Sequence, residues 1–206
     1  TTSWTYAFEP KPLDLAPLGA LITADAPSHY VTLKSGDYTD KGSAPLTWTA
    51  DAGVTQGKWG AKVAGPGAQV VSQTASNIGI AGSLTAFTVE LVAAHTLGGP
   101  LVAQSDDFQL GTSESKAYDG ASRVMRYTPV PASQGTHYAA VLDAGTLTIY
   151  RNGAPVGSSV FTETRKVTYP VTLGLRGSAE IAHVAIYRGK ALSAARIAEH
   201  AKAVTG

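Results

Sequence analysis

The stretch that most constrains the fold is a strand-like run that ends in a two-residue turn. Residues Thr146–Arg151, TLTIYR, are rich in β-branched and aromatic side chains and are followed directly by Asn152 and Gly153. A type I′ turn needs positive φ at both central residues, and Asn-Gly is the pair that supplies it most readily. The sequence therefore predicts a β-hairpin whose return strand begins near Ala154.

Similar short runs recur along the whole chain of 206 residues, separated by its 22 glycines and 11 prolines. Turn signals at intervals of about 8–12 residues are typical of a β-sandwich or barrel. In residues 86–93, AFTVELVA, Phe87 and its alternate neighbours share one face, and Glu90 lies on the other. We expect this strand to bury the first face and to line an outer sheet surface with the second. Residues 169–175 and 179–187 are predicted to form two further strands.

The sequence predicts one helix, close to the C-terminus. Residues 194–203, AARIAEHAKA, are strong helix formers, and Ser193 can cap their first turn. Ile197, Ala201 and Val204 fall on one stripe. We expect this helix to lie as a lid across one end of the sandwich.

The first 27 residues differ from the rest because their prolines, among them Pro17, oppose a long regular element. Within them, Trp4, Tyr6 and Phe8 alternate with small residues and share one face of a strand. Such a strand belongs either to the protein's own sheet or to an arm that docks on a neighbour. We divide the chain into an extended N-terminal arm, residues 1–27, and a single domain, residues 28–206.

Composition excludes several classes of partner and site. There are 16 basic and 15 acidic residues, so no basic field exists to hold nucleic acid. The absence of cysteine excludes thiolate metal sites, and no run reaches the length of a membrane span. The first ten residues lack the pattern of a signal peptide, so we expect a removed signal or release without secretion, as in cell lysis.

Several segments carry a family resemblance in the same order along the chain. They are HYVTLKSGDYTDKGSAPL (29–46), GKWG (57–60), AFTVELVA (86–93), LVAQSDDFQL (101–110), HYAAV (137–141), IYRNG (149–153) and VAIYRGKALS (184–193). Over residues 30–203 the chain resembles the laminin-G-like branch of the concanavalin-A-like domains. The resemblance implies an all-β, jelly-roll β-sandwich with a short C-terminal helix. The family usually has an Asp-Glu pair where this chain has Ala182 and His183, and we expect His183 to face the surface or a loop.

The sequence does not support an enzyme. Retaining glycosidases need two carboxylates about 5–5.5 Å apart. Glu90 is the one acidic residue inside the strand predicted over residues 86–93, and it has no acidic neighbour two or four residues away. No G-x-S-x-G elbow is present either. We therefore predict no catalytic residues.

Calcium is the one metal ion that the resemblance leaves open, since related domains hold it at a rim with Asp side chains. Asp106, Asp107 and Asp119 are the first candidates for ligand binding, followed by Asp37 and Asp40. The alternative is that these residues form turns by bonding their own backbone. The sequence assigns no metal site and no cofactor.

A glycan site would need an exposed aromatic platform. Trp48 is the candidate, because Trp59 belongs to the GKWG scaffold segment and is expected in the core. Tyr187 is expected to be structural, whereas His95 could lie at a rim.

These observations favour a non-catalytic structural or interaction protein. The resemblance extends to bacteriophage proteins, so the first hypothesis is a virion surface protein, a capsid decoration or minor tail protein. It would attach to other virion proteins or to itself through Trp4, Tyr6 and Phe8 and form oligomers. The alternative is an extracellular, lectin-like module that binds a cell-surface glycan, with or without calcium. Neither hypothesis involves nucleic acid or a membrane.

Overall fold

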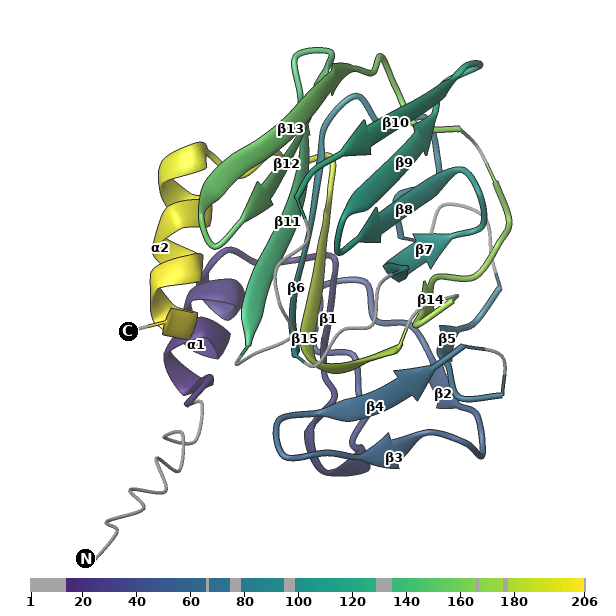
Figure 1. Cartoon of the computed structure of the whole chain (residues 1–206), viewed down its shortest axis with the longest axis vertical. Helices are drawn as coiled ribbons and strands as arrows, with labels where there is room; N and C mark the ends of the chain where they lie inside the picture. The colour runs from purple at the N-terminus through teal and green to yellow at the C-terminus, as the bar shows by residue number, and fades with distance from the viewer. Residues whose placement is uncertain are drawn as a thin grey trace, which may run out of the picture.

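The computed structural model describes residues 14–65, 67–74, 79–94, 99–128, 135–165, 167–175 and 178–205. The strands that it describes all belong to two antiparallel sheets (Figure 1). The first sheet contains β1 (His29–Thr32), β3 (Thr55–Gln56), β4 (Ala61–Ala64), β6 (Phe87–Ala94), β11 (Thr136–Asp143), β12 (Thr146–Arg151), β13 (Ala154–Val160) and β15 (Ser178–Arg188). The second contains β2 (Trp48–Ala50), β5 (Val70–Ser72), β7 (Pro100–Gln104), β8 (Phe108–Gly111), β9 (Glu114–Tyr118), β10 (Ser122–Arg126) and β14 (Thr172–Leu173).

The order of the first sheet is β13-β12-β11-β6-β15-β4-β3, with β1 also pairing with β15, and that of the second is β10-β9-β8-β7-β14-β5-β2. The two sheets enclose one apolar core. Phe87 of the first sheet and Phe108 of the second meet edge to face, with ring centroids 5.5 Å apart. The all-β sandwich expected from the sequence is confirmed.

The predicted hairpin is present as β12 and β13. Asn152 and Gly153 have φ of 49° and 80°, and Arg151 pairs with Ala154 across the turn. The second turn residue also approaches the C-terminal helix closely, because a Cβ on Gly153 would lie 2.9 Å from the Cα of Ala198. Glycine is therefore required here both for its backbone conformation and for the space.

Strand β15 organises the first sheet. Along one side it pairs with β6 throughout, and along the other it pairs first with β4 and then with β1. The register shifts between Ile181 and His183, so that Ala182 is an extra residue. Such a bulge bends the strand and changes the direction of the following side chains. Before the bulge Glu180 lies on the outer face of the sheet, and after it His183 does.

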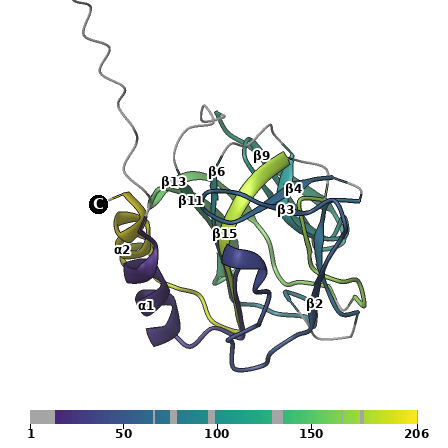
Figure 2. The same ribbon diagram turned by 90° about the horizontal axis from the view of Figure 1, so that it is seen from below.

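Helix α2 (Ala194–Thr205) begins as expected, with the amide of Arg196 donating to the Ser193 hydroxyl at 3.2 Å. Its position differs from the expected lid at one end of the sandwich. The helix lies on the outer face of the first sheet, where Ile197 packs in one cluster with Val92 of β6 and Ala139 of β11. The outward positions of these central strands include Val92, Ala139 and Val141, so the helix covers a partly apolar face of the sheet (Figure 2).

The expectation of a single helix and an extended arm is wrong for part of the arm. Residues Ala16–Ala24 form helix α1, which lies beside α2 (Figures 1 and 2). Pro17 is tolerated because it occupies the first turn, where its missing N–H has no intrahelical partner to lose. Leu18 and Ile22 are each 1% exposed and belong to the same apolar cluster as α2. A short 3-10 helix, η1 (Lys34–Gly36), follows β1.

Candidate functional site

The GKWG segment forms the loop of the β3–β4 hairpin and lies over β15. The amide of Gly57 donates to the carbonyl of Gly60 at 2.8 Å and closes the loop. A Cβ on Gly60 would lie 2.0 Å from the carbonyl oxygen of Ile181, and a Cβ on Gly57 would overlap the carboxylate of Glu180. Both glycines are therefore needed for the loop to approach the strand this closely.

Glu180 holds this loop in place. It is 3% exposed, and one carboxylate oxygen accepts hydrogen bonds from the amides of Trp59 and Gly60, the latter at 3.0 Å. Hydrogen bonds between a carboxylate and backbone amides are among the strong ones in proteins. Glu180 thus fixes how Lys58 and Trp59 are presented.

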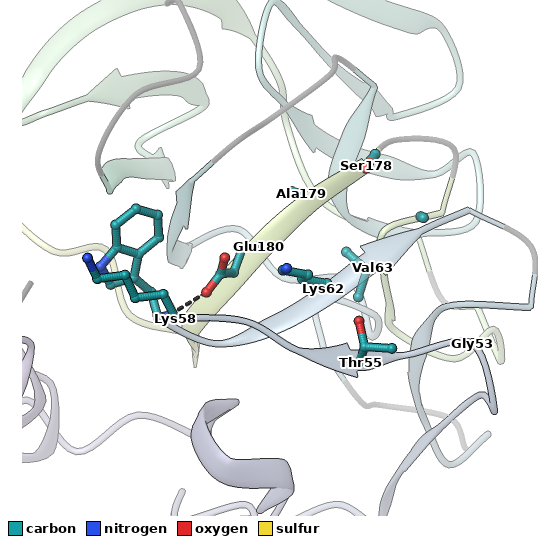
Figure 3. Close-up of a pocket in the computed structure, with 10 residues that line it drawn as sticks. Gly53, Thr55, Lys58, Lys62, Val63, Ser178, Ala179 and Glu180 are labelled. Carbon is teal, nitrogen blue, oxygen red and sulfur yellow. Dashed lines mark hydrogen bonds between the residues drawn. The ribbon is translucent and has the colours of Figure 1, made fainter. Parts of the chain in front are cut away.

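A cavity of about 610 Å³ lies on one side of the loop, on the outer face of the first sheet (Figure 3). Its lining combines Trp59 with polar side chains from three strands: Thr55 of β3, Lys62 of β4, and Ser178 and Glu180 of β15. Figure 3 shows Thr55, Lys62 and Ser178 on the strands beside Glu180. The volume lies within the range of about 300–1,000 Å³ that small-molecule sites occupy.

A second cavity of about 370 Å³ lies on the other side of the same loop. Lys58 and Trp59 line both cavities. The second is bounded by the start of α1 and by Tyr30, Lys34 and His183. The two cavities therefore adjoin across a ridge made by Lys58 and Trp59.

His183 lines this second cavity from within β15, together with Lys58 and Trp59 of the loop, in line with the expectation that it faces the surface or a loop. Burial is the main cause that lowers the pKa of His183, to about 4, so the ring is neutral near pH 7. Its Nδ1 lies 2.9 Å from the hydroxyl of Tyr30. In the neutral ring, Nδ1 can accept a hydrogen bond from the Tyr30 hydroxyl, and the ring N–H is then on Nε2.

The most unexpected feature is a buried polar cluster between the first sheet and the two helices. Glu90, expected on an outer sheet surface, is 1% exposed. Its carboxylate accepts from Nε2 of His137 at 2.9 Å, from Nδ1 of His200 at 2.9 Å and from the hydroxyl of Tyr187 at 2.7 Å. Nε2 of His200 in turn lies 3.1 Å from a carboxylate oxygen of Asp25, at the end of α1.

The charge of Glu90 is stabilised by these partners. Burial acts to raise the pKa of Glu90, but the hydrogen bonds and charges of His137 and His200 outweigh it and lower the pKa to about 2. Both ring nitrogens of His200 face carboxylates, those of Glu90 and Asp25. Sequence reasoning missed this cluster, because the signal was spread over β6, β11 and α2.

The two helices are joined to this cluster by ion pairs. Arg196 of α2 contacts Asp25 at 2.7 Å and also donates to the carbonyl of Leu21, in the last turn of α1. A cation at a helix C-terminus complements the helix dipole. Glu90, His137, Tyr187 and His200 are each at most 1% exposed and line neither cavity, so this cluster holds the helices on the sheet and does not contact a ligand there.

Trp48 is not an exposed platform. It is 7% exposed and belongs to the core between the sheets. Its Nε1 donates at 3.3 Å to Asp40, which also accepts from the amides of Tyr30 and Leu46. Burial acts to raise the pKa of Asp40, but hydrogen bonds from His29 and from backbone amides lower it. Asp40 thus ties the segment before β2 to β1.

The other aspartates are engaged in turns and ion pairs. Asp107 contacts Arg165 at 3.0 Å and Asp119 contacts Arg123 at 3.2 Å, while Asp106 accepts from Gln109 at 2.9 Å. Asp37 accepts from the amide two residues later, as in an Asx turn. In the part of the chain that the structure describes, no group of three or more His, Asp or Glu side chains is arranged to hold a metal ion.

Trp59 is 9% exposed, and Tyr187 is buried against Glu90, in line with their expected scaffold positions. Trp4, Tyr6, Phe8 and His95 lie outside the described residues. Neither of the two α-helices that are described has the length and apolar character that crossing a membrane requires.

Solved structures with the same fold include toxin binding domains. The binding domain of Paraclostridial Mosquitocidal Protein 1 superposes with a TM-score of 0.67 at 13% identity, over 88% of this chain and 52% of that one. The receptor binding domain of botulinum neurotoxin D gives 0.68 at 14% identity, over 86% and 52%. The botulinum neurotoxin DC binding domain in complex with SialylT gives 0.64 at 10% identity, over 87% and 52%. The present chain thus spans about half the length of these neighbours, and the likeness concerns the fold.

No curated protein sequence matches this chain. A family model does: residues 82–198, more than half of the chain, match the one described as the Concanavalin A-like lectin/glucanases superfamily. The matched segment contains the strands from β6 to β15 and the start of α2. It agrees with the two-sheet sandwich and with the resemblance of the short segments. The chain belongs to the Concanavalin A-like lectin/glucanases superfamily.

Proposed function

We propose that this domain is a non-catalytic binding module and that the cavity beside Trp59 is its carbohydrate site. The observation that carries the proposal is the composition of the cavity lining. It combines the small accessible part of Trp59, a residue that is 9% exposed, and strand backbone with hydroxyl and ammonium groups from Thr55, Ser178 and Lys62. Sugars present apolar C–H faces and hydroxyl groups, so they need both kinds of contact.

The absence of a second carboxylate argues against hydrolysis at this place. Glu180 is the single acidic side chain of the described lining, and its carboxylate is engaged by the loop amides. Hydrolysis of a glycosidic bond in the usual way requires two carboxyl groups on either side of that bond. Glu90, with its three partners under the helices, is out of reach of a ligand.

Relatives in fold are consistent with a binding role. The neighbours named above are described as binding domains, one of them in complex with SialylT, and another structure of the group is in complex with rat synaptotagmin II. At 10–14% identity they support the general class of function, and the choice of carbohydrate rests on the cavity itself.

The test is a glycan array probed with the full chain and with Thr55→Trp. Thr55 is exposed and lines the cavity, so a larger side chain there would fill it without removing a buried group. Thr47→Trp is the matched control, since Thr47 is exposed and outside the cavity lining. We expect the wild-type chain and the control to bind carbohydrate, and Thr55→Trp to bind at least about tenfold more weakly. A blank array, or equal binding by all three, would overturn the proposal.

A more specific proposal, that the protein lies on the surface of a virion, rests on the aromatic residues of the N-terminal segment, residues 1–13. Its residues Trp4, Tyr6 and Phe8 precede α1, which packs on the sandwich. A chain that begins at Asp14 keeps Leu18 and Ile22 and tests the segment alone, whereas removal of residues 1–26 would also expose the α2 cluster. We expect the full chain to be oligomeric and the shortened chain monomeric by light scattering. Two monomers would count against self-assembly through this segment.

A further inference from the structure

We propose that the ligand of this module is an acidic oligosaccharide that crosses the Lys58–Trp59 ridge and occupies both cavities. This inference rests on the proposed function, because it specifies the ligand of the same site. Its basis is the distribution of charge around the two cavities, together with the ridge that they share.

Three lysines define the charge. Lys62 lines the first cavity, Lys34 the second, and Lys58 both. All three are exposed, and none lies within ion-pair distance of a carboxylate among the residues that the structure describes. The ammonium of Lys58 lies 5.7 Å from the centre of the Trp59 ring, a cation–π distance that keeps it on the ridge.

The lysines of the lining outnumber its acidic side chains, Glu180 and Asp14. Glu180 lies across from Lys62 in the pairing of β15 with β4, and one of its carboxylate oxygens accepts from the amides of Trp59 and Gly60. Asp14, at the far rim of the second cavity, accepts the amide of Ala16 at the start of α1. With three lysines, two carboxylates and a neutral His183, the lining of the two cavities keeps a net positive charge, which favours an acidic ligand.

The neutral groups of the second cavity fit a sugar. The neutral His183 has its Nε2 N–H as a donor, and Thr32 adds a hydroxyl from β1. Hydroxyls of a sugar can pair with such groups, and its carboxylate or sulfate with the lysines. The ridge lies between the cavity that Lys62 lines and the cavity that Lys34 lines. A ligand that contacts both lysines therefore needs two or more sugar rings.

The anionic character is tested by measuring the affinity of the full chain for oligosaccharides that differ only in an acidic substituent. Suitable pairs are sulfated and unsulfated, or carboxylated and reduced, forms of the same oligosaccharide. We expect the acidic member to bind at least about tenfold more tightly, as charge-assisted hydrogen bonds predict, and the advantage to shrink at high salt. If acidic and neutral members bind equally, this inference is overturned while the proposed function stands. If no member binds, the proposed function fails as well.

The span across the ridge is tested with Lys34→Glu and Lys62→Glu, one in each cavity. Lys202→Glu on α2 is the matched control, with the same change of charge on an exposed side chain away from both cavities. Thermal unfolding of each variant checks that the fold is kept. We expect both cavity variants to weaken binding of the acidic oligosaccharide by about tenfold or more, and the control to change it by less than about twofold.

Two results would overturn the inference. If one cavity variant alone weakens binding, the ligand occupies a single cavity. If inorganic polyphosphate or single-stranded DNA competes as well as the acidic oligosaccharide, the lysines recognise charge alone, and the carbohydrate assignment is wrong.

Discussion

The buried carboxylate of Glu90 allows a quantitative prediction about stability. We expect Glu90→Gln to lower the free energy of unfolding by about 3–5 kcal/mol, the range for removal of one partner from a buried ion pair. A glutamine offers one acceptor oxygen where the carboxylate accepts from His137, His200 and Tyr187. Its NH₂ group would also face N–H donors, so at least one buried donor would lose its partner.

The same carboxylate makes stability depend on pH. The pKa of Glu90 is about 2 in the folded protein, below its ordinary value of 4.5, so its contribution is present above pH 4.5 and is lost as the pH falls through 2. The difference corresponds to about 3 kcal/mol, of which about 2 kcal/mol disappears between pH 6 and pH 3. Glu90→Gln should lack this part of the acid sensitivity.

The assay is equilibrium unfolding in urea of the wild-type chain and Glu90→Gln at pH 6 and at pH 3. We expect the difference in free energy between the two proteins to be about 2 kcal/mol smaller at pH 3. Glu199→Gln is the control, because Glu199 pairs with Arg196 at the surface with its side chain 55% exposed, and such pairs contribute at most about 1 kcal/mol. A difference that stays the same at both pH values would refute the argument that Glu90 is charged in the folded protein.

Three further substitutions test the packing around the site, each measured by urea unfolding. Leu18→Ala should cost about 2–5 kcal/mol, because α1 is part of the core, and a negligible cost would show that α1 is detached. Gly60→Ala should cost more than about 2 kcal/mol, since its Cβ would meet the Ile181 carbonyl and backbone cannot move aside easily; an unchanged midpoint would contradict the close approach. Gly153→Ala should cost about 1–3 kcal/mol from its φ of 80° and the nearby Ala198, and a stable variant would argue against the turn geometry.

Local patterns were good predictors wherever one short segment carries its own signal. Asn152-Gly153 specified the turn, and Ser193 specified the start of α2. The strand expected over residues 169–175 is reduced to Thr172–Leu173. Pairing with β5 and β7 extends over these two residues only, and the number of paired residues depends on the neighbours.

The sequence analysis does not predict helix α1, because the prolines of its segment oppose a long regular element. Proline opposes a helix in its interior but not in its first turn, where Pro17 lies. What keeps such a short helix folded is the burial of Leu18 and Ile22 against α2. That contact joins residues about 175 positions apart in the chain, so no local pattern contains it.

The candidate site was predicted only in part. The sequence identified GKWG as a scaffold segment, yet did not place it beside Glu180 or show that Trp59 lines two cavities. The preferred residue, Trp48, is in the core because Asp40 and the facing sheet enclose it. Whether an aromatic side chain of the second sheet is buried or exposed depends on which face of that sheet packs against the first sheet.

The sequence by itself determined the class of fold, the family and the tight turns, because turn chemistry and the alternation of apolar residues act over a few neighbouring positions. Only the tertiary structure decided which polar residues meet. Glu90 alternates with core residues as a solvent-facing side chain would, and it is buried because α1 and α2 cover that face and supply His200 and Asp25. The Lys58–Trp59 ridge likewise depends on Glu180 of β15, whose carboxylate holds the loop, and on the close approach of Gly60 to that strand. Both sites are built from segments far apart in the chain, and their meeting depends on packing of whole elements.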